Sequence, residues 1–378
     1  MAGRMSGEHG PALVVRRPGE VVLEDRAAPR PGPGEMLVRP GVVGLCGTDL
    51  DIVAGRIDPA YIRYPLVLGH EWSGTVAGAD GAALAADGQH GDGQNAAGQN
   101  AAGQNAAGQN AAGQDGESLA PGTRVVGEGI VPCGHCARCR AGQTNLCLTY
   151  DELGFTRDGA AASFLAIQRS LVHPLAPGVG AEDAALAEPA SVVYRGLSGA
   201  AIAPGWRALV VGDGTVALLA VRLLTLWSPA ETVVLGRREG QAALAVQAGA
   251  ARFETDSRAA GTGYDLVVEA AGTTDAVLSA LAAARRGGTV VLLGLPPHGA
   301  TAAVPVDDVV NNDLIIRGSF GYTSAAWREV VTLLNAGLLQ LGFLVTHRFP
   351  LTEWEAALDT LREPVSARGK VMLTVGST

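Results

Sequence analysis

The chain has 378 residues, of which 47% are hydrophobic and 17% charged, and its formal net charge is −9. This length allows a large buried core without cross-links, and five cysteines are too few for a disulfide-stabilised secreted protein. The acidic balance opposes nucleic-acid binding. Because no signal-peptide pattern is found and Asp213 and Arg222 interrupt the most apolar segment, we predict a soluble, cytoplasmic protein without a membrane span.

Residues from about 12 to 190 contain short β-branched runs separated by turn signals, which is typical of a β-rich unit. A repeat interrupts this zone, because GQNAA occurs four times between Gly93 and Ala112. Its five-residue period matches neither a helix nor a strand, and its composition has nothing to bury. We therefore expect a solvated, disordered loop over about residues 79–120, with a binding segment as the alternative.

Four cysteines lie close together in the sequence, at spacings of three, three and eight residues: Cys133, Cys136, Cys139 and Cys147. One loop with these spacings can turn four sulfurs toward a single point, as a tetrahedral structural zinc requires. The sequence therefore predicts a structural zinc lobe over residues 133–147. Reduced cysteines without metal and an iron–sulfur cluster are the alternatives, and His135 could compete as a ligand.

The fifth cysteine, Cys46, stands alone in GLCGTDL, and GHEWSG follows with His70 and Glu71. A thiolate, an imidazole and a carboxylate on separate loops suit a catalytic zinc, which keeps one position free for water or substrate. Taken singly, Cys46 and His70 would be read as ordinary core residues. Their occurrence together favours a metal site.

Residues from about 205 to 320 alternate apolar strands with helical stretches, one of them over residues 274–287, in the pattern of a parallel, doubly wound sheet. The first strand runs into Gly212, Gly214 and Ala217 and then into an apolar helix, which is the GxGxxA form of the dinucleotide fingerprint in its required context. The helix N-terminus would bind the pyrophosphate. The tail is predicted to hold helices over 324–337 and 352–364 and a closing strand over 370–375.

The end of the second strand of this zone bears on cofactor choice. NAD-binding proteins carry an acid there for the ribose diol, but this chain has Gly236 followed by Arg237 and Arg238. Two guanidinium groups without an opposing acid suit a 2′-phosphate. We therefore predict that NADP is preferred over NAD, with a solvated helix start as the alternative role for both arginines.

The motifs GLCGTD and GHEWSG, the four-cysteine lobe and the following βαβ zone together resemble the zinc-dependent medium-chain dehydrogenase/reductase family. This resemblance covers the chain from about residue 12 to its end, except for the repeat. It implies an α/β fold with a GroES-like catalytic domain over residues 1–190, a Rossmann domain over 191–320 and a C-terminal return to the catalytic domain over 321–378. The active site would lie between the two domains.

The resemblance also implies a ligand set for the catalytic zinc. Cys46 and His70 match permanent ligands of the family, and Glu188 in ALAEPASVVYRGL matches the position of a further ligand. Glu71 and Glu188 would be conditional ligands that exchange with water. The alternative for Glu188 is a carboxylate that only complements the helix dipole.

Further roles follow from the same resemblance. Thr48 would be the first proton relay, Asp51 would extend the relay or cap a loop, and Asp49 would orient a ligand. Lys370 matches a basic position that contacts cofactor phosphate. The chain would carry two zinc ions and form a homo-oligomer, either a dimer or a tetramer.

The implied reaction is hydride transfer between a nicotinamide cofactor and a small-molecule alcohol or ketone. GHEWSG and DELGFTRDGA resemble aminocyclitol dehydrogenases, whereas LGRR and EPASVVYRG resemble glucose dehydrogenase-like enzymes. We therefore predict oxidation of a secondary alcohol of a sugar, polyol or aminocyclitol, or the reverse. A zinc-free quinone or enoyl reductase and a non-catalytic nucleotide-binding protein are the alternatives.

Overall fold

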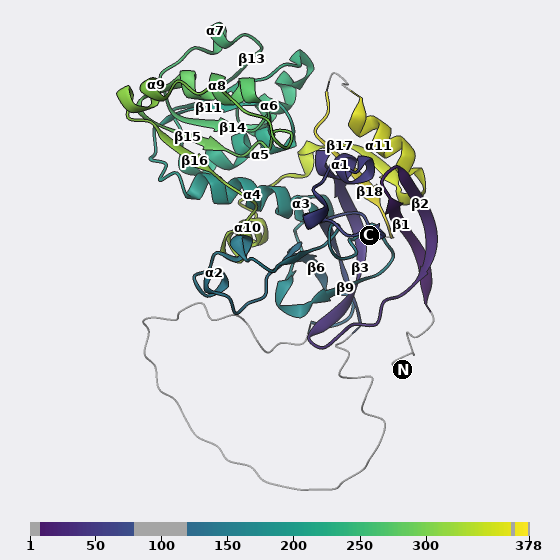
Figure 1. Cartoon of the computed structure of the whole chain (residues 1–378). Coiled ribbons are helices and arrows are strands. Elements are labelled where there is room, and N and C mark those ends of the chain that lie inside the picture. Colours follow the sequence, from purple (N-terminus) through teal and green to yellow (C-terminus); the bar gives the residue numbers. More distant parts are fainter. Residues whose placement is uncertain (1–7, 79–118, 364–366, 377–378) are drawn as a thin grey trace, which may run out of the picture.

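A computed structural model describes residues 8–78, 119–363 and 367–376, and its chain course is shown in Figure 1. The predicted repeat loop lies almost wholly outside the described residues. Within the described parts of the chain, no helix is long and apolar enough to cross a membrane.

The elements alternate between a strand-rich first part and a middle part in which strands and helices take turns. The strands are β1 (His9–Arg17), β2 (Glu20–Ala27), β3 (Glu35–Leu45), β4 (Leu66–Val67), β5 (Glu71–Gly78), β6 (Arg124–Gly127), β7 (Ile130–Val131), β8 (Asp151–Glu152), β9 (Leu165–Gln168), β10 (Val172–Pro174), β11 (Arg207–Val211), β12 (Glu231–Leu235), β13 (Arg252–Glu254), β14 (Tyr264–Glu269), β15 (Ala284–Leu292), β16 (Ile315–Gly318), β17 (Val345–Pro350) and β18 (Lys370–Thr374). The helices are α1 (Gly47–Ala54), α2 (Ala137–Arg140), α3 (Ala181–Ala185), α4 (Ala187–Ser198), α5 (Thr215–Leu224), α6 (Ala242–Ala248), α7 (Ser257–Ala260), α8 (Thr274–Ala283), α9 (Val306–Asn311), α10 (Ser324–Asn335) and α11 (Trp354–Arg362).

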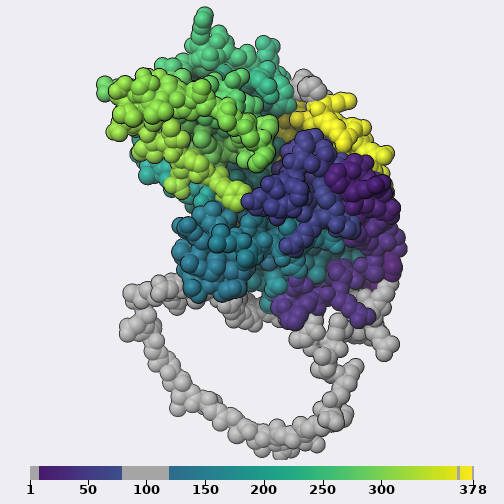
Figure 2. All heavy atoms as spheres, in the orientation of Figure 1, coloured from purple at the N-terminus to yellow at the C-terminus, as the bar shows by residue number. Residues whose placement is uncertain are grey.

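The strand-rich part forms a three-stranded sheet in the order β2-β1-β4, a two-stranded sheet of β7 and β8, and a seven-stranded sheet that includes the end of the chain. Its strand order is β10-β6-β5-β3-β18-β17, and β9 also pairs with β3. In Figure 2 the yellow C-terminal segment packs against the purple N-terminal segment. Strand β18 runs antiparallel to β3 and sets Val371 opposite Leu45, while β5 on the other side sets Glu71 opposite Gly44. These two registers place Lys370, Glu71 and Cys46, the residue after Leu45, close together.

The middle part forms a six-stranded parallel sheet in the order β13-β12-β11-β14-β15-β16. The predicted doubly wound parallel sheet is therefore confirmed. Both sheet faces are buried, because Val210 on β11 packs in the same core as α4 and α5, whereas Leu209 packs in the core that includes α8. Strands covered on both faces read as continuous apolar runs, as the sequence of this region does.

Helices α4 and α10 pack together between the two sheets (Figure 1), and each contributes side chains to a common core. Ahead of α10, the hydroxyl group of Tyr322 accepts hydrogen bonds from the backbone N–H groups of Gly129 and Ile130, at 2.7 and 3.1 Å. This buried contact ties the segment that leaves the parallel sheet to the first part of the chain.

One predicted helix is shorter than expected. The apolar spacing predicted a helix over residues 274–287, but α8 ends at Ala283 and Ala284 is already extended, with ψ of 142°. Gly287 has a φ of +68°, which a continuing helix does not allow, and Arg285 donates to Asp265 from the strand conformation at 2.6 Å. Backbone geometry at the glycine pair therefore overrides the helical spacing.

Candidate active site

Cys46 lies at the end of β3 and caps α1, so its backbone is held on both sides. Its Sγ accepts the backbone N–H of Thr48 at 3.3 Å, and its own N–H donates to the Asp49 carboxylate at 2.8 Å, which completes a capping box. The same Sγ lies 3.3 Å from Nε2 of His70. The structure therefore brings together the two side chains predicted as permanent zinc ligands.

His70 is buried directly ahead of β5 and is oriented from two sides. Its ring packs against Phe155, with 5.3 Å between the centroids, and its Nδ1 lies 3.8 Å from the Asp49 carboxylate. Burial opposes protonation, but the negative charges of Cys46 and Asp49 raise the pKa of His70 well above its ordinary value. A bound dication at Nε2 would supply the positive charge that this surrounding favours.

Two glutamates complete the candidate metal centre. The donor atoms of His70, Glu71 and Glu188 lie within 4.8 Å of one another, as do those of Cys46, Asp49 and His70. Glu188 sits in the first turn of α4, where the helix dipole also favours a carboxylate. Its burial raises its pKa to about 8. Closely spaced acids such as the buried Glu71 and the partly buried Glu188 fit a cation, which would offset their mutual repulsion.

Sequence reasoning did not single out Glu152 on β8, which borders the same place. Burial raises its pKa to about 7, and the nearby His70 opposes that rise. The signal in the sequence was its position in DELGFTRDGA, a segment that resembles aminocyclitol dehydrogenases.

Lys370 has a different partner from the one expected. The family resemblance implied contact with cofactor phosphate, but Nζ of Lys370 lies 2.6 and 2.7 Å from the two carboxylate oxygens of Glu71 and donates to the Leu45 carbonyl at 3.3 Å. Lys370 and Glu71 are each 2% exposed. The missed signal was composition, since Lys370 is the single lysine of the chain beside 27 arginines. An ammonium is a compact point charge, which suits a small buried pocket better than a guanidinium does.

The two residues predicted to relay a proton lie on α1 but in different surroundings. Thr48 is partly buried beside Cys46, whereas Asp51 is 43% exposed on the outer face of the helix. The Asp51 carboxylate is bound by Arg56, at 2.7 Å from Nε and 2.6 Å from Nη2. The structure therefore brings Thr48 to the metal ligands and leaves Asp51 at the surface.

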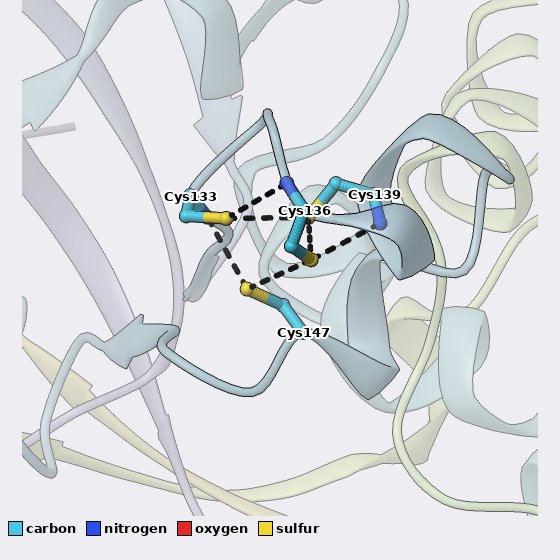
Figure 3. A group of neighbouring side chains, drawn as sticks. All are labelled: Cys133, Cys136, Cys139 and Cys147. Carbon is cyan, nitrogen blue, oxygen red and sulfur yellow. Dashed lines mark hydrogen bonds between the residues drawn. The ribbon is translucent and has the colours of Figure 1, made fainter.

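The four-cysteine lobe forms a second, separate group, drawn in Figure 3. Sulfur–sulfur distances include 3.5 Å between Cys136 and Cys139, 3.9 Å between Cys133 and Cys139, and 4.0 Å between Cys136 and Cys147. Four thiolates around a tetrahedral zinc, with Zn–S near 2.3 Å, would be about 3.8 Å apart. Backbone N–H groups lower the pKa of Cys133 to about 5, as a thiolate ligand requires. Nδ1 of His135 lies 2.7 Å from the Cys133 carbonyl oxygen.

The glycine loop of the parallel sheet has the open shape that a dinucleotide needs. Gly212 has a φ of +129°, and a Cβ there would lie 3.0 Å from the Ala270 backbone. Gly214 is the N-cap of α5, has no side-chain cap, and has nothing within 4 Å of the place of a Cβ. Ala217 is fully buried against the sheet. A pyrophosphate could therefore approach the backbone at Gly214 without meeting a side chain, and the N–H groups at the start of α5 would bind it.

Arg237 and Arg238 follow β12 after Gly236, at the same edge of the sheet. Their backbone N–H groups both donate to the carboxylate of Asp213, the residue between the two fingerprint glycines, at 2.8 and 2.9 Å. Sequence reasoning used the glycines and passed over Asp213. A charged residue in a loop that must approach phosphate was the signal available in the sequence.

Two family models match the chain. The first, "Alcohol dehydrogenase GroES-like domain", matches residues 32–93 and 87–177, and the second, "Glucose dehydrogenase C-terminus", matches residues 181–368.

Similar proteins cover nearly the whole chain. Sorbitol dehydrogenase of Gallus gallus is 31% identical over 387 residues, with 97% of each chain covered. L-threonine 3-dehydrogenase of Aeromonas hydrophila is 28% identical, with 93% of this chain and 95% of that protein covered. A solved structure described as a zinc-binding dehydrogenase from Sinorhizobium meliloti bound to NADP has a TM-score of 0.81 at 25% identity, and covers 97% of this chain and 99% of its own.

Proposed function

The chain belongs to the zinc-dependent medium-chain dehydrogenase/reductase family, and from this premise we propose that it oxidises a secondary alcohol of a sugar, polyol or aminocyclitol to the ketone, or catalyses the reverse. The observation that carries the proposal is the approach of Cys46 Sγ to His70 Nε2 beside Glu71 and Glu188. A site with several carboxylates supports a substrate rich in hydroxyl groups, because each carboxylate oxygen accepts hydrogen bonds. The sulfur and imidazole pair weighs against a zinc-free reductase.

The side chains of the candidate active site would have separate roles in this reaction. Cys46 and His70 would hold the metal, Asp49 would keep the His70 ring in position, and Glu71 and Glu188 would be conditional ligands. Zinc would lower the pKa of the substrate hydroxyl and the nicotinamide would accept the hydride. Thr48, at the start of α1 next to Cys46, would take the proton from the hydroxyl, and Asp51 would pass it toward solvent.

A substrate panel tests the reaction directly. Zinc-loaded protein is offered cyclitols, aminocyclitols, sugars and simple primary alcohols, with NAD and NADP in separate assays, and cofactor reduction is followed by absorbance. We expect cofactor reduction with ring or chain polyols. We also expect a higher kcat/KM with NADP, because position 236 is glycine and carries no carboxylate that would repel a 2′-phosphate bound by Arg237 and Arg238. No reduction with any substrate at full zinc occupancy would refute the dehydrogenase proposal.

We also propose two zinc ions per chain, one at each cysteine-containing site. Cys139→Ser is expected to lower the zinc content by one ion per chain and to lower the Tm. Asn145 and Thr144 of the lobe bond to Phe320, ahead of α10, and to Ser324, its first residue, so loss of the lobe would remove these contacts. Elemental analysis and thermal unfolding measure both effects. An unchanged zinc content in this variant would favour a lobe without metal.

The proposal includes a homo-oligomer formed through β16, the edge strand of the parallel sheet. Ile315, Ile316 and Phe320 around this edge are 59%, 41% and 54% exposed, and such an edge offers unpaired backbone groups to a second copy. Ile315→Lys is expected to lower the mass measured by light scattering, whereas Val246→Lys, an exposed aliphatic site on α6, should not. A monomeric unsubstituted protein would contradict this proposal.

The proposed domain division follows the sequence analysis, with residues 1–190 and 321–378 in the catalytic domain and 191–320 in the nucleotide domain. Its support is the sheet that joins β3 to β18 and stays separate from the six parallel strands.

The proposed cytoplasmic location is supported by chemistry, since thiols that bind zinc must stay reduced.

A further inference from the structure

The Asp213 carboxylate is held by four donors at the edge of the nucleotide sheet. Oδ2 accepts the N–H groups of Arg237 and Arg238 at 2.8 and 2.9 Å, and Oδ1 accepts Nε and Nη2 of Arg238 at 3.1 and 2.7 Å. A carboxylate offers about four acceptor positions, so all of them are in use. Its side chain is 12% exposed, and these hydrogen bonds outweigh its burial and lower its pKa.

The packing around Gly236 explains why no acid occupies the usual place at the end of β12. A Cβ at Gly236 would lie 2.4 Å from the Phe253 ring and 2.8 Å from Cβ of Asp213. Neighbouring side chains therefore exclude any larger residue at this position. Asp213 cannot act as a substitute acid for the ribose diol of NAD, because its acceptor positions are filled.

Arg238 is held by Asp213 on one edge of its guanidinium and leaves the other edge available. Nε and Nη2 are bound to Asp213, the latter also to its backbone carbonyl at 3.1 Å, whereas Nη1 has no partner among the described residues. The Arg238 side chain is 22% exposed, so the Nη1 edge can reach a ligand. The neighbouring Arg237 is exposed, and its guanidinium has no partner in the described part of the chain.

Hydrogen bonds also connect the loop at Asp213 to the C-terminal segment. Gln241, which is fully buried, donates to the backbone carbonyls of Asp213 at 2.5 Å and Arg368 at 2.8 Å, and accepts the Arg368 N–H at 2.8 Å. Burial, and next the charge of Arg238, lower the pKa of the Arg368 guanidinium, so the two arginines are close enough to repel each other. The guanidinium groups of Arg237, Arg238 and Arg368 thus outnumber the single carboxylate of Asp213. The net charge of this group of side chains is positive, which favours binding of an anion.

We propose that Asp213 is a positioning residue that orients Arg238, so that the Nη1 edge of Arg238 together with Arg237 binds the 2′-phosphate of NADP. This inference rests on the proposed NADP preference and names the residue through which that preference acts. A bound 2′-phosphate would take the open guanidinium edge without displacing the bonds to Asp213.

Binding of adenosine phosphates to the full-length, zinc-loaded chain tests the proposal without turnover. Calorimetry compares 2′,5′-ADP with 5′-AMP for the unsubstituted protein and for Asp213→Asn. The asparagine oxygen can still accept the two backbone N–H groups, but its NH₂ group faces the donors of Arg238 and releases them. We expect 2′,5′-ADP to bind roughly tenfold more weakly to the variant, and 5′-AMP to bind within about twofold of the unsubstituted protein.

Asp265→Asn is the matched control. Asp265 also accepts a backbone N–H, from Arg207 at 2.8 Å, and an arginine Nε, from Arg285 at 2.6 Å, but near the opposite ends of the parallel strands. It should leave the affinity for both nucleotides unchanged. A similar loss of 2′,5′-ADP affinity in this control would mean that Asp213→Asn acts only by loosening the sheet.

A double-variant cycle separates orientation from charge. Arg238→Ala alone should weaken 2′,5′-ADP binding, and adding Asp213→Asn should weaken it no further if Asp213 acts through Arg238. Additive losses, or unchanged or tighter binding to Asp213→Asn, would overturn the inference. Equal binding of both nucleotides to the unsubstituted protein would refute the NADP preference and this inference together. Selective 2′,5′-ADP binding without any alcohol oxidation would refute only the proposed reaction.

Discussion

Cys46→Ser is expected to lower kcat/KM by about three orders of magnitude, and to remove one zinc ion per chain. Loss of a thiolate ligand weakens the metal site, and metal activation of the substrate is worth several kcal/mol, or about tenfold for each 1.4 kcal/mol. Serine is a good helix N-cap, so α1 and its capping box should persist. Steady-state kinetics and elemental analysis check both expectations.

The design of this variant separates chemistry from folding. Sγ of Cys46 both approaches His70 and accepts the Thr48 N–H, and only the first contact is lost with serine. The Tm of Cys46→Ser, which keeps the zinc of the four-cysteine lobe, should stay close to that of the unsubstituted protein. A Cys46→Ser protein with full zinc content and unchanged kcat/KM would contradict the assignment of Cys46 as a catalytic ligand.

Lys370→Met is expected to produce the largest loss of stability. The variant leaves the Glu71 carboxylate buried without its counter-charge, and breaking a buried ion pair in this way costs about 3–5 kcal/mol. For a chain of this length, that free energy corresponds to a decrease in Tm of roughly 5 °C. Thermal unfolding at fixed zinc and cofactor concentration is the measurement.

Two further variants show whether the pair itself is responsible. Lys370→Met combined with Glu71→Gln should recover much of the lost Tm, because no charge then stays buried alone. Lys370→Arg should not restore it fully, since a guanidinium is larger and needs more donor contacts than the Glu71 and Leu45 oxygens offer. Equal Tm values for Lys370→Met and the unsubstituted chain would show that the ion pair contributes nothing to stability.

Local spacing accounts for the features that sequence reasoning predicted well. The four lobe cysteines lie within one short segment, and the glycine fingerprint joins a strand to the helix that follows it. In both cases the backbone between the residues is too short to place them far apart, so the motif carries its own geometry. The parallel sheet was likewise predictable, because strands that are buried on both faces have continuous apolar sequences.

Where sequence reasoning was wrong or incomplete, packing between distant segments decided the outcome. The helix expected to reach residue 287 stops at Ala283, because its continuation pairs with a neighbouring strand. Asp213 was passed over although it lies inside the fingerprint, since its role depends on Arg238 and on the crowding at Gly236. Neither relation is visible in the spacing of one element.

The sequence by itself determined the fold family, the four-cysteine lobe and the nucleotide loop, because the lobe and the loop each depend on residues that are neighbours along the chain. Only the tertiary structure decided the partner of Lys370, which binds Glu71 from 299 residues away. That pairing follows from the registers of β5 and β18 on the two sides of β3. Register is set by the packing of whole strands on a common core, so it cannot be read from the residues that it brings together.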